Sequence, residues 1–162
     1  MKVKIGKYPK GDGERKINVH IDSHDTWSMY ETLSYIIVPM LKQLKETKQG
    51  SPFIDDEDVP EHLRSSKAPP VENTWDADEH YHYHARWDWV LNEMTWTFEQ
   101  YQTEWENQFF HGNIDYKINE DGILVEGPNH TLIIDEENRK KHIERMKHGR
   151  MLFAKYYECL WD

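Results

Sequence analysis

Two histidines and an aspartate recur at one-turn intervals in the middle of the chain. If a helix begins near Asp76, then His80, His84 and Asp88 lie on one of its faces. Two imidazoles one turn apart, followed by a carboxylate, could ligate zinc or a similar divalent ion. The spacing is also common in helices that bind no metal, and no HExxH motif is present. A polar, solvent-facing start of the helix is therefore the simpler interpretation.

Other catalytic patterns are weak or absent from the sequence. The acidic run Asp55–Asp58 offers oxygen ligands for magnesium or calcium, but it lacks EF-hand spacing and is expected to be solvated. Cys159 is the only cysteine and has no obvious base nearby, and no nucleophile elbow, phosphate-binding loop or dinucleotide fingerprint occurs. We therefore predict no catalytic residue.

Tryptophans crowd the same third of the chain. On a helical wheel Trp87 belongs to a stripe that is expected to enter the core, together with Val90, Leu91, Met94, Phe98, Tyr101, Trp105 and Phe109. Trp89 and Trp96 fall on the opposite side. A helix with two apolar faces needs a second partner, which is another part of this chain, a second subunit or a ligand.

Aromatic faces beside cations suit an anionic ligand that carries a nucleobase, because stacking one base is worth roughly 1–3 kcal/mol. Arg86 is close to these indoles in sequence, and further cations lie on the first and last helices. The predicted ligand-binding set contains Trp89, Trp96, Arg86, Lys42, Lys45, Arg145 and Arg150.

Three helices are expected to position these residues. The first has Ser28 and Glu31 at capping-box spacing and Pro39 in its middle, where a kink is expected. Its apolar positions are Trp27, Tyr30, Leu33, Ile37, Met40 or Leu41, and Leu44. The central helix is predicted over Asp76–Phe110. The last helix starts at Asp135, and its inner face is expected to contain Ile143, Met146, Arg150, Phe153, Tyr157 and Leu160.

Strands and a long loop complete the expected fold. Alternating apolar residues on both sides of turn-forming stretches predict one β-hairpin near the N-terminus and another around residues 114–126, and residues 131–135 form a possible third strand. The stretch from 49 to 74 is predicted to be a long loop with too few apolar residues to enter the core. The fold class is α+β in one domain.

Charge and hydropathy limit the possible partners. The net charge of −10 and the pI near 5.4 argue against nonspecific binding to a nucleic-acid backbone. No apolar run resembles a signal peptide or a membrane span, and a single cysteine allows no intrachain disulfide. We expect a soluble, intracellular protein.

Three stretches of the chain resemble an uncharacterised protein family encoded by tailed bacteriophages. They are "DTWSMYETLSYIIVPMLKQLKETKQGSPFIDDEDVPEHLRS", "RWDWVLNEMTWTFEQ" and "GRMLFAKYYECLWD". The resemblance implies an accessory protein in the host cytoplasm and brings no established enzyme activity.

By analogy with small phage accessory proteins, the leading hypothesis is a homo-oligomer that counters host defence by sequestering a small nucleotide signal. Its interface is expected to include Trp89 or Trp96, most simply in a two-fold dimer. One alternative is an acidic interaction protein or DNA mimic that inhibits a host protein. Another is a hydrolase whose zinc or other divalent ion is held by His80, His84 and Asp88; otherwise no cofactor is expected.

Overall fold

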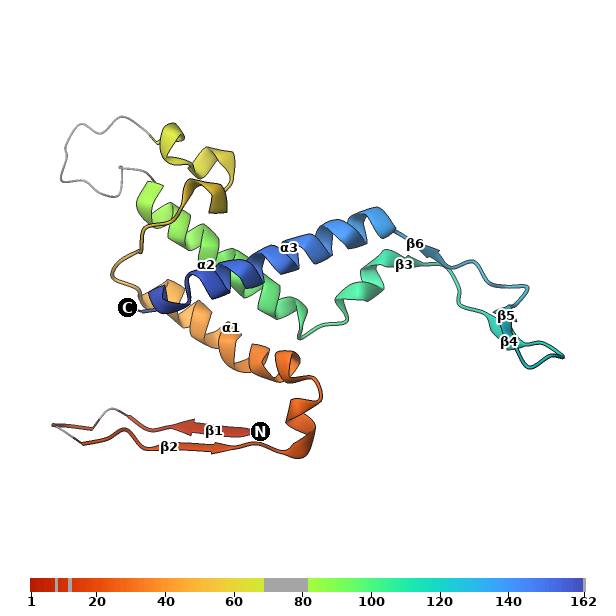
Figure 1. Ribbon diagram of the computed structural model, residues 1–162, viewed down its shortest axis with the longest axis horizontal. Helices are drawn as coiled ribbons and strands as arrows, with labels where there is room; N and C mark the ends of the chain where they lie inside the picture. Colours follow the sequence, from red (N-terminus) through yellow and green to blue (C-terminus); the bar gives the residue numbers. More distant parts are fainter. Residues whose placement is uncertain (8, 12, 69–81, 162) are drawn as a thin grey trace.

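The computed structural model describes residues 1–7, 9–11, 13–68 and 82–161, which form three α-helices and three short antiparallel strand pairs (Figure 1). The helices are α1 (Met29–Thr47), α2 (Tyr83–Gln100) and α3 (Glu136–Lys155). Short 3-10 turns are η1 (Ser23–Thr26), η2 (Asp56–Asp58), η3 (Glu61–Leu63), η4 (Ser65–Lys67), η6 (Trp105–Phe109) and η7 (Tyr157–Cys159). The predicted α+β class is confirmed. No helix in the described ranges combines the length and apolar composition needed to cross a bilayer.

Helix α2 is the centre of the core and packs against both α1 and α3. Trp87, Val90, Leu91 and Met94 are fully buried, and Phe98 is nearly so. These five residues were predicted to form a core stripe, and their burial confirms it. Removing these apolar side chains from water is the main favourable term in folding.

The central helix ends earlier than predicted. After Gln100 the backbone turns through hydrogen bonds of i→i−3 type, and residues 105–109 form η6. The side chains of Gln100 and Thr103 bond to carbonyls of the helix end, which offers the backbone an alternative to further helix. Phe109 is nevertheless buried.

The buried face of α1 differs from the predicted one. It consists of Ser34, Val38 and Leu41, with Ile37 and Leu44 partly buried. Three predicted core positions are exposed, namely Trp27, Tyr30 and Leu33, and of the alternatives Met40 and Leu41 only Leu41 is buried. Helix α1 carries apolar residues around much of its circumference, and only the side that meets α2 is covered. Pro39 lies inside the helix and does not end it, and the Ser28 side chain makes no capping hydrogen bond.

Helix α3 begins as predicted, because the Asp135 carboxylate accepts a hydrogen bond from the Asn138 amide at 3.1 Å. A side chain at Gly149 would overlap the Thr97 hydroxyl, so this glycine lets α3 approach α2 closely. The predicted inner face was wrong at Arg150 and Tyr157, which are exposed. The predicted Met146 is buried, and Gly149, Leu152 and Tyr156 are buried in addition.

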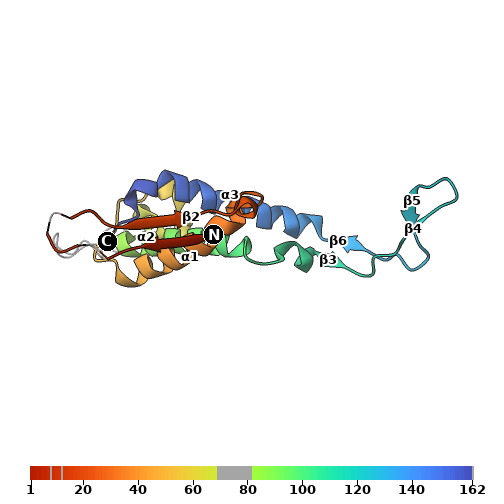
Figure 2. The same cartoon turned by 90° about the horizontal axis from the view of Figure 1, so that it is seen from below.

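Both predicted hairpins are present, and a third, separate strand pair lies at the base of the distal hairpin. The N-terminal ribbon pairs β1 (Lys2–Ile5) with β2 (Ile17–His20), and the distal ribbon pairs β4 (Tyr116–Ile118) with β5 (Leu124–Glu126). The third pair is β3 (Phe110–His111) with β6 (Ile133–Ile134). The distal ribbon projects away from the helices beyond the start of α3 (Figures 1 and 2).

Part of the stretch from 49 to 74 is a core element, which corrects the prediction for that loop. Ile54 and Val59 are only 2% and 4% exposed and pack with the helices. The end of this loop and the predicted start of the central helix, residues 69–81, lie outside the described residues.

Candidate ligand-binding groove

Helix α3 covers the second apolar face of α2. The Arg145 guanidinium lies 3.8 Å from the centre of the Trp96 ring, and the His142 ring lies 4.9 Å from it. Trp89 contacts His148 of the same helix, with 6.1 Å between ring centres. Among the three partners considered for this face, the structure provides another part of the chain. A subunit interface at Trp89 or Trp96 was expected because this apolar face needs a partner, and α3 of the same chain is that partner.

Arg145 forms a bidentate ion pair with Glu93. Its Nε and Nη2 atoms donate to the two carboxylate oxygens at 2.9 and 2.7 Å. The Glu93 side chain is only 10% exposed, whereas that of Arg145 is 49% exposed. Hydrogen bonding to Glu93 raises the pKa of Arg145, because the charged form is the one that is bonded. This cation stabilises the α2–α3 contact and is not free for a ligand.

Arg86 is a buried anchor for the loop. It is 2% exposed, and its Nη2 atom donates to the Ile54 carbonyl and pairs with Asp56 at 2.8 Å. The pKa of Asp56 is lowered, first by hydrogen bonds from Ser65 and then by Arg86. The predicted role of Arg86 as a ligand contact is corrected to a structural one, since ligand access would require moving this part of the loop.

Arg150 lies on the outer side of α3. Its guanidinium donates to the Tyr101 hydroxyl at the end of α2. Neither Arg150 nor Arg86 is among the described residues that line a groove with Lys42 and Lys45.

Three of the predicted residues do meet. Lys42, Lys45 and Trp96 line one groove between α1 and α2, with a cavity volume of about 470 Å³. The other lining residues are Glu46, Asn92, Thr95 and Glu99. The positions 92, 95, 96 and 99 follow helical spacing, as do 42, 45 and 46, so the sequence indicates that each set shares one helix face.

The groove has no net formal charge, because two lysines face two glutamates. Lys42 pairs with Glu99 at 2.6 Å, and Lys45 donates to the Asn92 side-chain oxygen at 2.8 Å. Both lysines are exposed. An exposed ion pair is worth about 0–1 kcal/mol, so a phosphate can replace Glu99 on Lys42 at little cost.

The predicted metal site is only partly described. His84 contacts the Ser51 hydroxyl at 2.6 Å through Nδ1, and Asp88 pairs with Lys48 at 3.1 Å. His80 lies outside the described residues. Within the described part of the chain, no three His, Cys, Asp or Glu side chains are grouped as metal ligands. The hydrolase hypothesis stays a prediction.

The acidic run at residues 55–58 is held by the end of α3, a role that sequence reasoning missed. Lys155 pairs with Asp55 at 2.7 Å and also with Asp58, and the Tyr156 hydroxyl donates to Asp58. Burial, followed by this hydrogen bond, raises the pKa of Tyr156 to about 12. Hydrogen bonds to the two aspartates raise the pKa of Lys155 above its ordinary value. These acids therefore serve to attach the loop.

No family model, no curated protein and no solved structure matches the chain.

Proposed function

We propose that the protein acts by binding rather than catalysis, and that it holds a small nucleotide in the groove between α1 and α2. The observation that supports this is the convergence of Lys42, Lys45 and Trp96 in one groove. Its volume of about 470 Å³ is within the usual range for small-molecule sites. In the context implied by the phage resemblance, such binding would sequester a host signal in the cytoplasm.

The charges of the groove restrict the ligand further. Two lysines are available, while Glu46 and Glu99 repel additional negative charge. The favoured ligand therefore has one or two phosphate charges together with a base, as cyclic dinucleotides do. A triphosphate is disfavoured, because its third and fourth charges would have no cation in the groove.

Calorimetry against cyclic dinucleotides, cyclic trinucleotides and ADP-ribose derivatives tests the proposal. The double variant Lys42→Ala/Lys45→Ala should weaken binding at least tenfold at low salt, because exposed charges are poorly screened there. The matched control is Lys140→Ala/Lys147→Ala on α3, outside the groove, which changes the net charge equally and should bind normally. The proposal fails if no ligand binds below about millimolar, or if the two double variants lose binding equally.

A second candidate function, that of a protein-interaction module, is favoured by the N-terminal ribbon. Its register pairs Val3 with Val19 and Ile5 with Ile17, so these four side chains share one face. All four are 39–66% exposed, and no described residue covers the face. A two-stranded ribbon is marginally stable alone, so an exposed apolar face of this kind suits a partner chain.

We propose a second copy of the protein as this partner, which moves the predicted homo-oligomer contact from the indoles to the ribbon. Residues 1–21 contain the cations Lys2, Lys4, Lys7, Lys10, Arg15 and Lys16 and only two acidic residues, whereas the whole chain has a net charge of −10. The basic ribbon of one copy is thus complementary to the acidic remainder of another.

Light scattering tests this at about 100 µM protein, where a micromolar dimer is well populated. Ile17→Lys/Val19→Lys should convert a dimer into a monomer. Ile118→Lys/Leu124→Lys makes the same exchange on the exposed distal ribbon and should leave the mass unchanged. A monomeric parent protein at this concentration contradicts the idea.

A further inference from the structure

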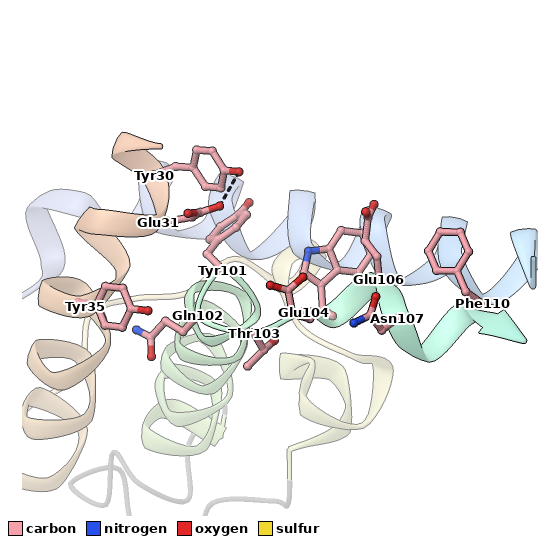
Figure 3. A pocket seen from close by; sticks show the side chains of 11 residues that line it. Tyr30, Glu31, Tyr35, Tyr101, Gln102, Thr103, Glu104, Glu106, Asn107 and Phe110 are labelled. Carbon is pink, nitrogen blue, oxygen red and sulfur yellow. Dashed lines mark hydrogen bonds between the residues drawn. The ribbon is translucent and has the colours of Figure 1, made fainter. Parts of the chain in front are cut away.

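A cavity of about 570 Å³ opens where the first turns of α1 meet the segment between α2 and η6 (Figure 3). Five aromatic residues line it: Tyr30, Tyr35, Tyr101, Trp105 and Phe110. In Figure 3, Tyr30, Glu31 and Tyr101 gather at one end and Phe110 lies at the other. The Tyr30 and Tyr101 rings meet edge to face, with 5.1 Å between their centres. The ring of Trp105 is stacked on His142, which fixes its orientation.

The charged residues that line the cavity are all acidic. They are Glu31, Glu104 and Glu106, and no Lys, Arg or His is among the described lining residues. Tyr30 donates to Glu31 at 3.0 Å, and Arg139 pairs with Glu106 at 3.1 Å. Glu104 pairs with no cation in the described ranges.

One further cation lies close to this cavity. Arg150 of α3 donates to the Tyr101 hydroxyl. Three carboxylates and five aromatic residues line the cavity. Neither Arg139 nor Arg150 is among its lining residues. The negative faces of aromatic rings and the carboxylates attract the same kind of ligand, a positively charged one.

We propose that this cavity binds an organic cation, either an alkylammonium or a guanidinium group. This goes beyond the groove between α1 and α2, which takes a ligand of opposite charge. Aromatic walls favour an organic cation over a small inorganic one, because an organic cation has apolar surface and loses less hydration when it leaves water. A free polyamine and the Lys or Arg side chain of a polypeptide share this chemistry.

Calorimetry with spermidine, a Lys-containing peptide, an Arg-containing peptide and Mg²⁺ tests the proposal. Glu31→Gln/Glu104→Gln keeps the shape of the cavity and should weaken amine binding about tenfold, through the loss of two charges. Tyr35→Ala should weaken it two- to fivefold, the range of an exposed cation–π contact. The control Glu120→Gln/Asp121→Asn removes two charges from the exposed turn of the distal ribbon and should have no effect.

Circular dichroism confirms that each variant is folded before its affinity is compared. Spermidine binding that exceeds peptide binding identifies a free amine as the ligand, and the reverse identifies a polypeptide side chain. The proposal is overturned if none of the organic cations binds, if Mg²⁺ competes with them equally, or if the control variant loses as much affinity as the cavity variant. Nucleotide titrations give an independent result for the groove.

Discussion

Arg145 of α3 donates two parallel hydrogen bonds to the Glu93 carboxylate of α2, and this pair fastens the two helices together. Removing Arg145 leaves the nearly buried Glu93 without its partner. We expect Arg145→Ala to destabilise the protein by about 1–3 kcal/mol, less than for a fully buried pair because Arg145 is half exposed. Urea unfolding measures the change.

A double-mutant cycle controls for the loss of the Arg145 side chain itself. Glu93→Gln and the double variant Glu93→Gln/Arg145→Ala complete the cycle. If the two single effects simply add, the pair contributes no coupling, and its role in holding α2 against α3 is refuted.

Arg86 should likewise behave as a structural residue. Arg86→Ala leaves the buried Ile54 carbonyl without this donor and Asp56 without this cation, so we expect a loss of about 2–4 kcal/mol. Hydrogen exchange should show the largest increase in residues 51–59. The control is Arg64→Ala in the same loop, where the side chain is exposed. Equal effects of the two variants would contradict the anchoring role.

Two tryptophans provide a matched test of burial. Trp87 is 0% exposed and Trp27 is 86% exposed. Trp87→Ala should cost about 3–5 kcal/mol, because it removes a large side chain from a packed core and leaves a cavity. Trp27→Ala should change the free energy of unfolding by less than about 0.5 kcal/mol. A large loss at Trp27 in the isolated chain would show that η1 packs more tightly than its exposure indicates.

His142 makes stability depend on pH. It packs among Trp96, Trp105 and Phe109, and burial, followed by the nearby Arg145 charge, lowers its pKa below the ordinary 6.5. As the pH falls, His142 therefore binds its proton at a higher pH in the unfolded chain than in the folded one. The corresponding stability is present above about pH 6.5 and declines as the pH falls toward the folded pKa.

The variant His142→Phe keeps an aromatic ring in this packing and removes the titration. Its melting temperature should fall less than that of the parent protein between about pH 7.5 and about pH 5.5. His20→Phe, on exposed β2, controls for the added apolar surface. An unchanged pH dependence in His142→Phe would remove His142 as its source.

The sequence was most informative where one helix carries a narrow apolar stripe. Trp87, Val90 and Met94 could be assigned to the core of α2, because they share one continuous apolar stripe at helical spacing. The prediction for α1 was right at Ile37, Leu41 and Leu44 and wrong near its N-terminus, because apolar residues surround this helix and a wheel cannot show which side α2 will cover. Leu41 and Trp27 look equivalent by periodicity, yet only the first is buried.

The candidate site was harder to predict than the core. Arg86 was assigned to a ligand because it lies close to the tryptophans in sequence, whereas the structure shows it buried and paired. Its actual partners, Ile54 and Asp56, lie in a loop about thirty positions earlier, and no local pattern connects them. Lys42, Lys45 and Trp96 belonged to one predicted ligand-binding set, and the structure places all three in one groove; that a ligand binds there stays a prediction.

The strand pair β3–β6 has a consequence for how this chain tolerates change. Phe110 faces Ile134 across it, so the segment that carries the distal ribbon leaves and re-enters the body at adjacent points. The pair β3–β6 is thus a narrow neck between this segment and the helices. Residues 112–132 could be replaced by a tight turn or by a foreign sequence without disturbing the helices. Differences in length or sequence between variants of this protein would then accumulate beyond the neck, and the three-helix body would remain constant.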